Sequence, residues 1–136
     1  MTARADFENL LARASWGYDE ADPDLVASCF TDDARMSLRI GRDGQLVGPF
    51  DGRAAIRKLH ADSMAAQTDQ RRHNLSNLWV DEEGADAATV VSNLTLLSVE
   101  NGAVGVLSSG WYRDRLARRD GTWLIVERYV YLDLPY

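Results

Sequence analysis

The chain of 136 residues has 46% hydrophobic and 26% charged residues, a composition typical of one globular domain, which argues against a disordered or fibrous protein. Its net charge of −6 argues against a nucleic-acid partner, because such proteins bind by neutralising phosphates. The single cysteine, Cys29, excludes an internal disulfide. It lies in an apolar stretch, so we expect a buried structural thiol.

Helical periodicity marks three segments of the first half. Apolar residues recur at spacings of three and four over residues 5–18, which predicts an amphipathic helix there. Asp22 followed by Pro23 is typical of a helix start and predicts a short second helix that runs through Phe30. A third, partly apolar segment predicts a helix over residues 53–66.

Alternation of apolar and polar residues predicts strands in the rest of the chain. A half-buried strand is expected at residues 35–40, followed by a turn and a short return strand at 45–50. Four longer strands, separated by turn signals, should follow, and the last three of them should form an antiparallel meander. Their predicted ranges are 72–80, 87–99, 104–118 and 122–132. This order indicates an α+β fold with helices on the concave side of a strongly curved sheet.

The N-terminal residues lack the apolar segment of a signal peptide, and no apolar run in the chain is long enough to span a bilayer. We therefore expect a cytoplasmic protein with no membrane partner. The sequence contains two histidines at no metal-ligand spacing and no phosphate-binding glycine motif. A metal site and a bound cofactor are accordingly not expected.

Several motifs, taken in order along the chain, carry a family resemblance. They are YDEADPDL at residues 18–25, CFTDDA at 29–34, GPFDGRAAI at 48–56, RHNLSN at 72–77 and RDGTWLI at 119–125. In these segments the chain resembles the SnoaL-like and scytalone-dehydratase-like proteins of the nuclear-transport-factor-like superfamily. The resemblance implies a single domain over residues 1–136. It also implies a cone-shaped α+β barrel in which a mostly antiparallel sheet wraps around three helices.

The second half of the chain is also similar to the β subunits of aromatic-ring-hydroxylating dioxygenases. The similar segments are residues 91–93, 115–123 and 132–133. Such β subunits share this fold and are non-catalytic partners of a larger iron-containing subunit. The resemblance therefore leaves catalytic and structural roles open, since one fold hosts many functions.

The resemblance places Asp19 and His73 where these families carry a helix-end aspartate and a pocket histidine. A histidine exchanges protons near neutral pH, and a carboxylate bonded to its other ring nitrogen fixes the tautomer and stabilises the imidazolium. Taken alone, Asp19 is an ordinary turn residue and His73 a structural or surface histidine. We interpret His60, on the third predicted helix, as a surface or rim residue.

Aromatic and polar residues on the predicted strands are candidates for the pocket wall. Tyr112 falls where scytalone dehydratase carries a small polar side chain, so a substrate of that type is doubtful. Its hydroxyl could hold a carbonyl oxygen, although cross-strand packing is an equal alternative. Ser92 and Asn93 lie on opposite faces of their strand, so only one of them can face inward. The predicted substrate-binding residues are Trp16, Tyr18, Tyr112, Tyr129 and Asn93, which would suit a flat, partly apolar ligand.

These features lead to three hypotheses of function. The first is a cofactor-independent dehydratase, isomerase or polyketide-type cyclase that acts on a small hydrophobic oxygenated molecule through Asp19 and His73. The others are a β-type dioxygenase subunit and a small-molecule binding module without chemistry. In each case we expect a homodimer or homotrimer, formed through the outer sheet face that carries Trp111, Arg113 and Arg115.

Overall fold

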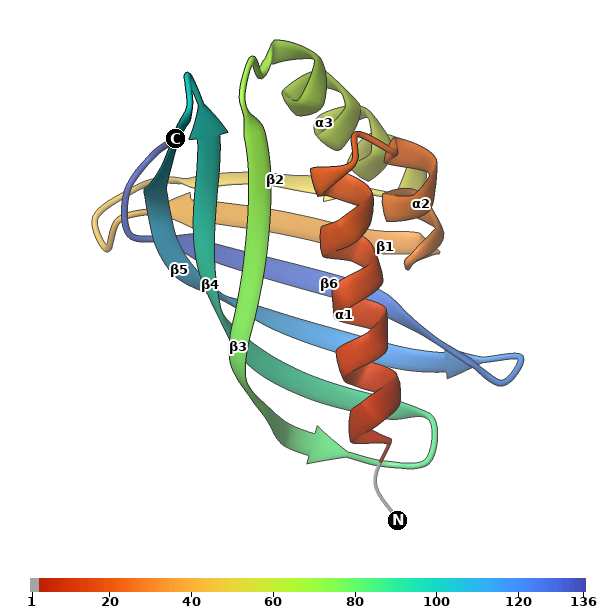
Figure 1. Ribbon diagram of the computed structural model, residues 1–136. Helices are drawn as coiled ribbons and strands as arrows, with labels where there is room; N and C mark the ends of the chain where they lie inside the picture. Colours follow the sequence, from red (N-terminus) through yellow and green to blue (C-terminus); the bar gives the residue numbers. More distant parts are fainter. Residues whose placement is uncertain (1–2) are drawn as a thin grey trace.

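The computed structural model describes residues 3–136, and the helices and strands follow one another in the predicted order (Figure 1). The helices are α1 (Arg4–Asp19), α2 (Pro23–Ser28) and α3 (Arg53–Ala66). The strands are β1 (Phe30–Ile40), β2 (Leu46–Asp51), β3 (Gln70–Glu83), β4 (Ala87–Glu100), β5 (Ala103–Arg119) and β6 (Thr122–Leu132). Within this range, no helix is both long enough and apolar enough to cross a membrane.

The short helix α2 ends two residues earlier than predicted, and β1 begins five residues earlier. Asp22 caps α2 by accepting a hydrogen bond from the backbone N–H of Leu25 at 3.0 Å. Ile125 of β6 then donates its backbone N–H to the carbonyl of Cys29 at 2.8 Å. This bond draws the chain into the sheet at Phe30, whose side chain is fully buried. Cys29 is also buried, as predicted, and burial raises the pKa of its thiol.

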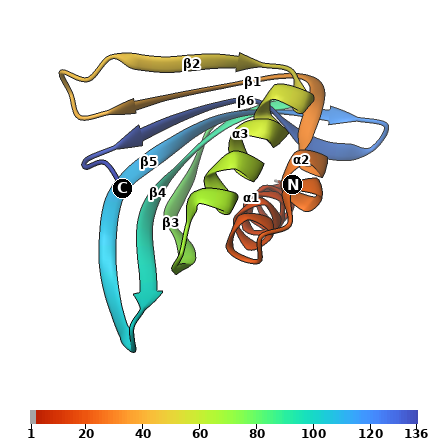
Figure 2. The ribbon, with the colours of Figure 1, turned by 90° about the horizontal axis from the view of Figure 1, so that it is seen from above.

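The six strands form one mixed sheet in the order β2-β1-β6-β5-β4-β3. The pairs of the meander β3-β4-β5-β6 are antiparallel, and so is β1-β2, whereas β1 and β6 are parallel. Figure 2 shows the strong curl of this sheet, with α1 and α3 on its concave side. The predicted α+β architecture is confirmed, with the detail that the sheet stays open and has β2 and β3 at its edges.

Apolar side chains from α1 and from the inner face of the sheet form the hydrophobic core. Phe7 and Leu11 of α1 are buried, and Phe7 packs edge-to-face on Trp123 of β6 with ring centroids 4.9 Å apart. Gly17 allows close packing of α1 on α2, because a Cβ there would lie 3.0 Å from Val26. Helix α1 therefore packs against α2 near its C-terminal end, and it also contacts the edge strand β3.

Candidate functional site

A cavity of about 210 Å³ lies between α1, α3 and the concave sheet face. Apolar side chains make up much of its wall, including Met36, Leu38, Leu59, Val130 and Leu132. Its polar wall residues include Tyr18, His60, His73, Tyr112, Arg128 and Tyr136. An apolar pocket with a few convergent polar groups is the usual form of a small-molecule site.

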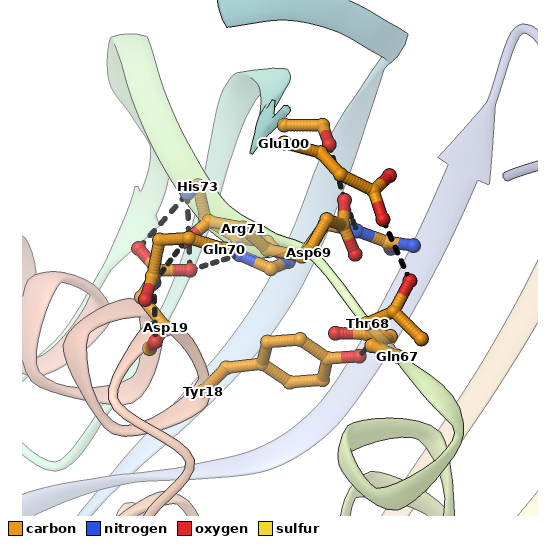
Figure 3. Close-up of polar contacts among 10 residues, drawn as sticks. Tyr18, Asp19, Gln67, Thr68, Asp69, Gln70, Arg71, His73 and Glu100 are labelled. Atoms are coloured by element: carbon orange, nitrogen blue, oxygen red, sulfur yellow. Dashed lines mark hydrogen bonds and ion pairs between the residues drawn. The ribbon is translucent and has the colours of Figure 1, made fainter. Parts of the chain in front are cut away.

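Asp19 and His73, which are 54 residues apart in the sequence, meet at the edge of this cavity (Figure 3). His73 Nδ1 lies 2.6 Å from Asp19 Oδ1, and each side chain is only 7% exposed. The backbone N–H of His73 also donates to the same carboxylate, at 3.0 and 3.2 Å from its two oxygens. An ionised carboxylate can only accept, so the proton of the neutral ring is on Nδ1 and Nε2 is left as an acceptor.

Neighbouring side chains hold this pair in place. The Gln70 side chain donates to the backbone carbonyl of Asp19 at 2.6 Å, which ties the end of α1 to β3. Tyr18 packs edge-on against the His73 ring at 4.7 Å, and its hydroxyl accepts a hydrogen bond from Gln67 (Figure 3). Burial raises the pKa of Tyr18, so its phenol is protonated at neutral pH.

His60 is buried in the cavity wall, so the expectation of a surface or rim position is wrong. It follows Ile56 by one helical turn, and α3 turns both residues toward the interior. Burial, with a smaller contribution from the nearby Arg128, lowers the pKa of His60 to about 4. The imidazole is therefore neutral at pH 7. Its Nδ1 has no hydrogen-bond partner among residues 3–136.

Arg128, on the sheet side of the cavity, forms a buried ion pair with Asp114. Arg128 Nε and Nη2 bind the two carboxylate oxygens at 2.7 and 3.0 Å, and the side chains are 6% and 0% exposed. Asp114 pairs directly with Arg128 across β5 and β6. The sequence reasoning missed both residues. A signal for Arg128 was present in the sequence. Arg128 lies two and four positions before the apolar Val130 and Leu132, so a charged side chain shares their face of the strand.

Two of the five predicted substrate-binding residues line the cavity and three do not. Tyr18 and Tyr112 are in its wall, and their contact with a substrate stays a prediction. The prediction that Trp16, Asn93 and Tyr129 face the cavity is wrong. Trp16 is 59% exposed, because it lies two residues from the inward Ala14 and Tyr18. It borders a second, more open groove between α1 and β3, which Asp19 and His73 also line.

Asn93 is turned outward by the period-two alternation of its strand. Tyr129 is turned outward because the pairing of β6 with β5 shifts register between Ile125 and Glu127, which moves the buried face from Ile125 to Arg128. Asn93 is exposed, whereas its neighbour Ser92 is buried at 1% exposure. Tyr129 follows the inward Arg128 and packs against Trp111 on the outer face, with ring centroids 5.4 Å apart. Across residues 3–136, no group of three or more His, Cys, Asp or Glu side chains could hold a metal ion.

Comparison with known proteins agrees with this architecture. Residues 1–129 match the family model described as the SnoaL-like domain. The chain belongs to the SnoaL-like family. No curated protein matches this SnoaL-like chain significantly, but many solved structures do.

Three of these structures illustrate the range of the SnoaL-like fold. A protein from Catenulispora acidiphila in complex with S-DNPA is 27% identical, with a TM-score of 0.80 and coverage of 95% of this chain and 92% of that one. A proposed scytalone dehydratase from Novosphingobium aromaticivorans is 20% identical, with a TM-score of 0.77 and coverage of 96% and 84%. The β subunit of a proposed aromatic-ring-hydroxylating dioxygenase from the same organism is 17% identical, with a TM-score of 0.85 and coverage of 98% and 91%.

Proposed function

We propose that this SnoaL-like domain is a cofactor-independent acid–base enzyme that moves a proton on a small hydrophobic, oxygenated substrate. The observation that carries the proposal is the 2.6 Å contact between Asp19 and His73 at the edge of a mostly apolar cavity. A histidine whose Nδ1 is bonded to a carboxylate, and whose Nε2 makes no hydrogen bond to residues 3–136, is equipped to act as a general base and then as a general acid.

The proposed step is proton transfer at a carbon next to a carbonyl group. Nε2 of His73 removes the proton, and the C–H electron pair moves toward the carbonyl oxygen to give an enolate. The ionised Asp19 stabilises the imidazolium that forms, as an orienting carboxylate does in a catalytic triad. The imidazolium then returns the proton to another carbon in an isomerase. In a dehydratase it gives the proton to a departing hydroxyl group, which leaves as water.

An exchange reaction tests this step without knowledge of the natural substrate. The probe is 2-tetralone, a two-ring ketone, and the readout is the rate at which its α-protons exchange with D2O, followed by proton NMR. We expect the wild-type protein to accelerate exchange and His73→Gln to lose about 10²- to 10⁴-fold of that acceleration. Asp19→Asn should also lose rate, because an amide no longer stabilises the imidazolium.

The matched control is Arg72→Gln, on the same edge strand. Among residues 3–136, the side chain of Arg72 makes one ion pair, a long 3.7 Å surface contact with Glu20. This variant should exchange at the wild-type rate. A folded His73→Gln protein that keeps the wild-type exchange rate overturns the proposal. Absence of acceleration by the wild-type protein on 2-tetralone and on other small cyclic ketones counts equally against it.

A second candidate is a binding module without chemistry. It is favoured by the cavity itself and by the S-DNPA complex of the 27% identical relative. Native mass spectrometry of the purified protein separates the two, since a carried small molecule with no exchange activity supports binding alone. The likeness to the dioxygenase β subunit is one of fold at 17% identity, and co-purification with a larger iron-containing subunit would be needed to argue that role.

Assembly into a homodimer or homotrimer stays a prediction. Trp111 stacks on Tyr131 with ring centroids 5.4 Å apart, on the outer face of β5 and β6. Such an aromatic surface, flanked by charged residues, is a common type of self-association interface. Sedimentation equilibrium over a range of concentrations tests it, and a monomer at every concentration would contradict it.

A further inference from the structure

The cavity wall contains a positively charged side chain whose role the Asp19–His73 pair does not explain. Within the described part of the chain, one guanidinium, that of Arg128, is in the cavity wall, and no aspartate or glutamate is. Asp114 pairs with Arg128 from outside the cavity wall and is fully buried. Asp19 borders the separate groove between α1 and β3. The protein carries a net charge of −6, yet this internal surface presents a cation.

Two nitrogens of the Arg128 guanidinium are held by hydrogen bonds, and the third, Nη1, is not. Nε and Nη2 bind Asp114, and the guanidinium carbon lies 4.2 Å from the ring centroid of Tyr112. Two bonds to one carboxylate and an aromatic ring against the guanidinium restrict its orientation. No hydrogen bond or ion pair joins Nη1 to any of residues 3–136.

This nitrogen is also not fully buried. The fully buried side-chain nitrogen and oxygen atoms without a partner belong to Thr31, His60, Arg71 and Ser92, and Arg128 Nη1 is not one of them. Since Arg128 is in the cavity wall, Nη1 is a preorganised donor that a bound molecule can reach. A donor of this kind, attached to a cation in a largely apolar site, favours an oxygen that carries or develops negative charge.

We propose that Arg128 binds the carbonyl oxygen of the substrate and stabilises it as an enolate, so that the substrate class is one- or two-ring ketones. This inference rests on the proposed acid–base function and assigns its oxyanion contact. When His73 Nε2 takes the α-proton, the C–H electron pair becomes the new C=C bond, and the carbonyl π electrons move to the oxygen. The negative charge then sits opposite Nη1, and it returns to carbon when His73 gives the proton back.

The cavity is large enough for a ring compound. On the measure that gives about 210 Å³, one water molecule needs about 10 to 15 Å³, so the cavity has room for about 14 waters or more. One ring or two fused rings fit such a space. Asp114, in this scheme, is a positioning residue that holds the guanidinium without contacting the substrate.

Equilibrium binding tests the oxyanion contact separately from turnover. The probes are 2-naphthol and naphthalene, which share a two-ring skeleton and differ in one hydroxyl group, and the readout is fluorescence titration. We expect wild-type protein to bind 2-naphthol at least tenfold more tightly than naphthalene, a difference of about 1.4 kcal/mol. We also expect bound 2-naphthol to ionise at a lower pH than the free compound, which an absorbance titration detects.

The main variant is the double substitution Asp114→Leu with Arg128→Met, which removes both charges and so leaves no buried charge unpaired. A second pair, Asp114→Asn with Arg128→Gln, keeps polar side chains at the two positions and serves if the apolar pair does not fold. Either folded double variant should lose the preference for 2-naphthol and the lowered ionisation pH, with naphthalene binding changed less than threefold.

His73→Gln is the control that separates this inference from the proposed function. It should abolish proton exchange and keep the preference for 2-naphthol, because Arg128 is unchanged. A folded double variant that retains the tenfold preference overturns the oxyanion contact, even if the exchange reaction succeeds. Wild-type protein that binds neither probe, or both equally, overturns the assignment of substrate class.

Discussion

Burial of His60 should make the stability of the protein depend on pH in a defined window. The imidazole is packed near Tyr18, His73 and the cation of Arg128, with its Nδ1 unpaired among residues 3–136. Desolvation by this burial lowers its pKa from 6.5 to about 4. In the unfolded chain the same ring takes up a proton near pH 6.5, so protonation favours unfolding over the interval between the two values.

The size of the effect follows from the two pKa values. Each unit of difference corresponds to about 1.36 kcal/mol, so a fall from 6.5 to about 4 is worth roughly 3 kcal/mol. Because the folded pKa is depressed, this stability is fully present above about pH 6.5. It is lost progressively as the pH falls toward 4. With total stabilities of about 5 to 15 kcal/mol, a loss of this size is readily measured.

Urea unfolding, followed by tryptophan fluorescence and far-UV circular dichroism at pH 7, 6, 5 and 4, measures the loss. The comparison is between wild type and His60→Gln, a polar side chain that does not titrate. All other titrating groups occur in both proteins, so the difference between their pH profiles isolates His60. We expect wild type to lose about 3 kcal/mol more than the variant between pH 7 and pH 4. Parallel profiles that differ by less than about 1 kcal/mol would refute the reasoning.

Three further predictions concern stability, each measured by urea unfolding at pH 7. Asp114→Ala leaves a buried guanidinium unpaired and should cost about 3 to 5 kcal/mol; a loss below 1 kcal/mol would contradict the burial of the pair. Gly110→Ala would place a Cβ 1.9 Å from a backbone oxygen of β6 and should cost more than about 2 kcal/mol. The control Gly105→Ala has open space and should change stability by under about 0.5 kcal/mol. Phe7→Ala should cost about 3 to 5 kcal/mol, and Trp16→Ala, at a site 59% exposed, much less; equal losses would argue against the packing of α1 described above.

Much of the fold could be predicted from the sequence because its signals are local. The predicted third helix agrees at both ends with α3, since its limits depend on Gly52 before it and the loss of periodicity after it. The boundary between α2 and β1 was predicted less well. The bond from Ile125 to Cys29, where β1 begins, joins residues 96 positions apart, so no local sequence pattern predicts it.

Asp19 and His73 could be chosen as a candidate pair from their positions in two motifs. Their residue types are suited to acid–base chemistry, and the family resemblance indicated the end of a helix and the start of a strand. The contact between them depends on the packing of α1 against the edge strand β3, where the carboxylate also accepts the backbone N–H of His73. That second bond could not be anticipated, because it requires the free edge of the sheet to lie beside α1.

The sequence by itself determined the elements, their order and, between irregularities of the sheet, which residues of a strand share a face. In β6 a register shift between Ile125 and Glu127 changes the buried face, and no local pattern predicts it. Only the tertiary structure decided which of the two faces turns inward, and so which of Ser92 and Asn93 is buried. It also decided that Asp114 and Arg128 are paired, because the register of β5 and β6 sets them opposite each other. The physical reason is that alternation is a property of one strand, whereas burial and charge pairing belong to surfaces that distant segments form together.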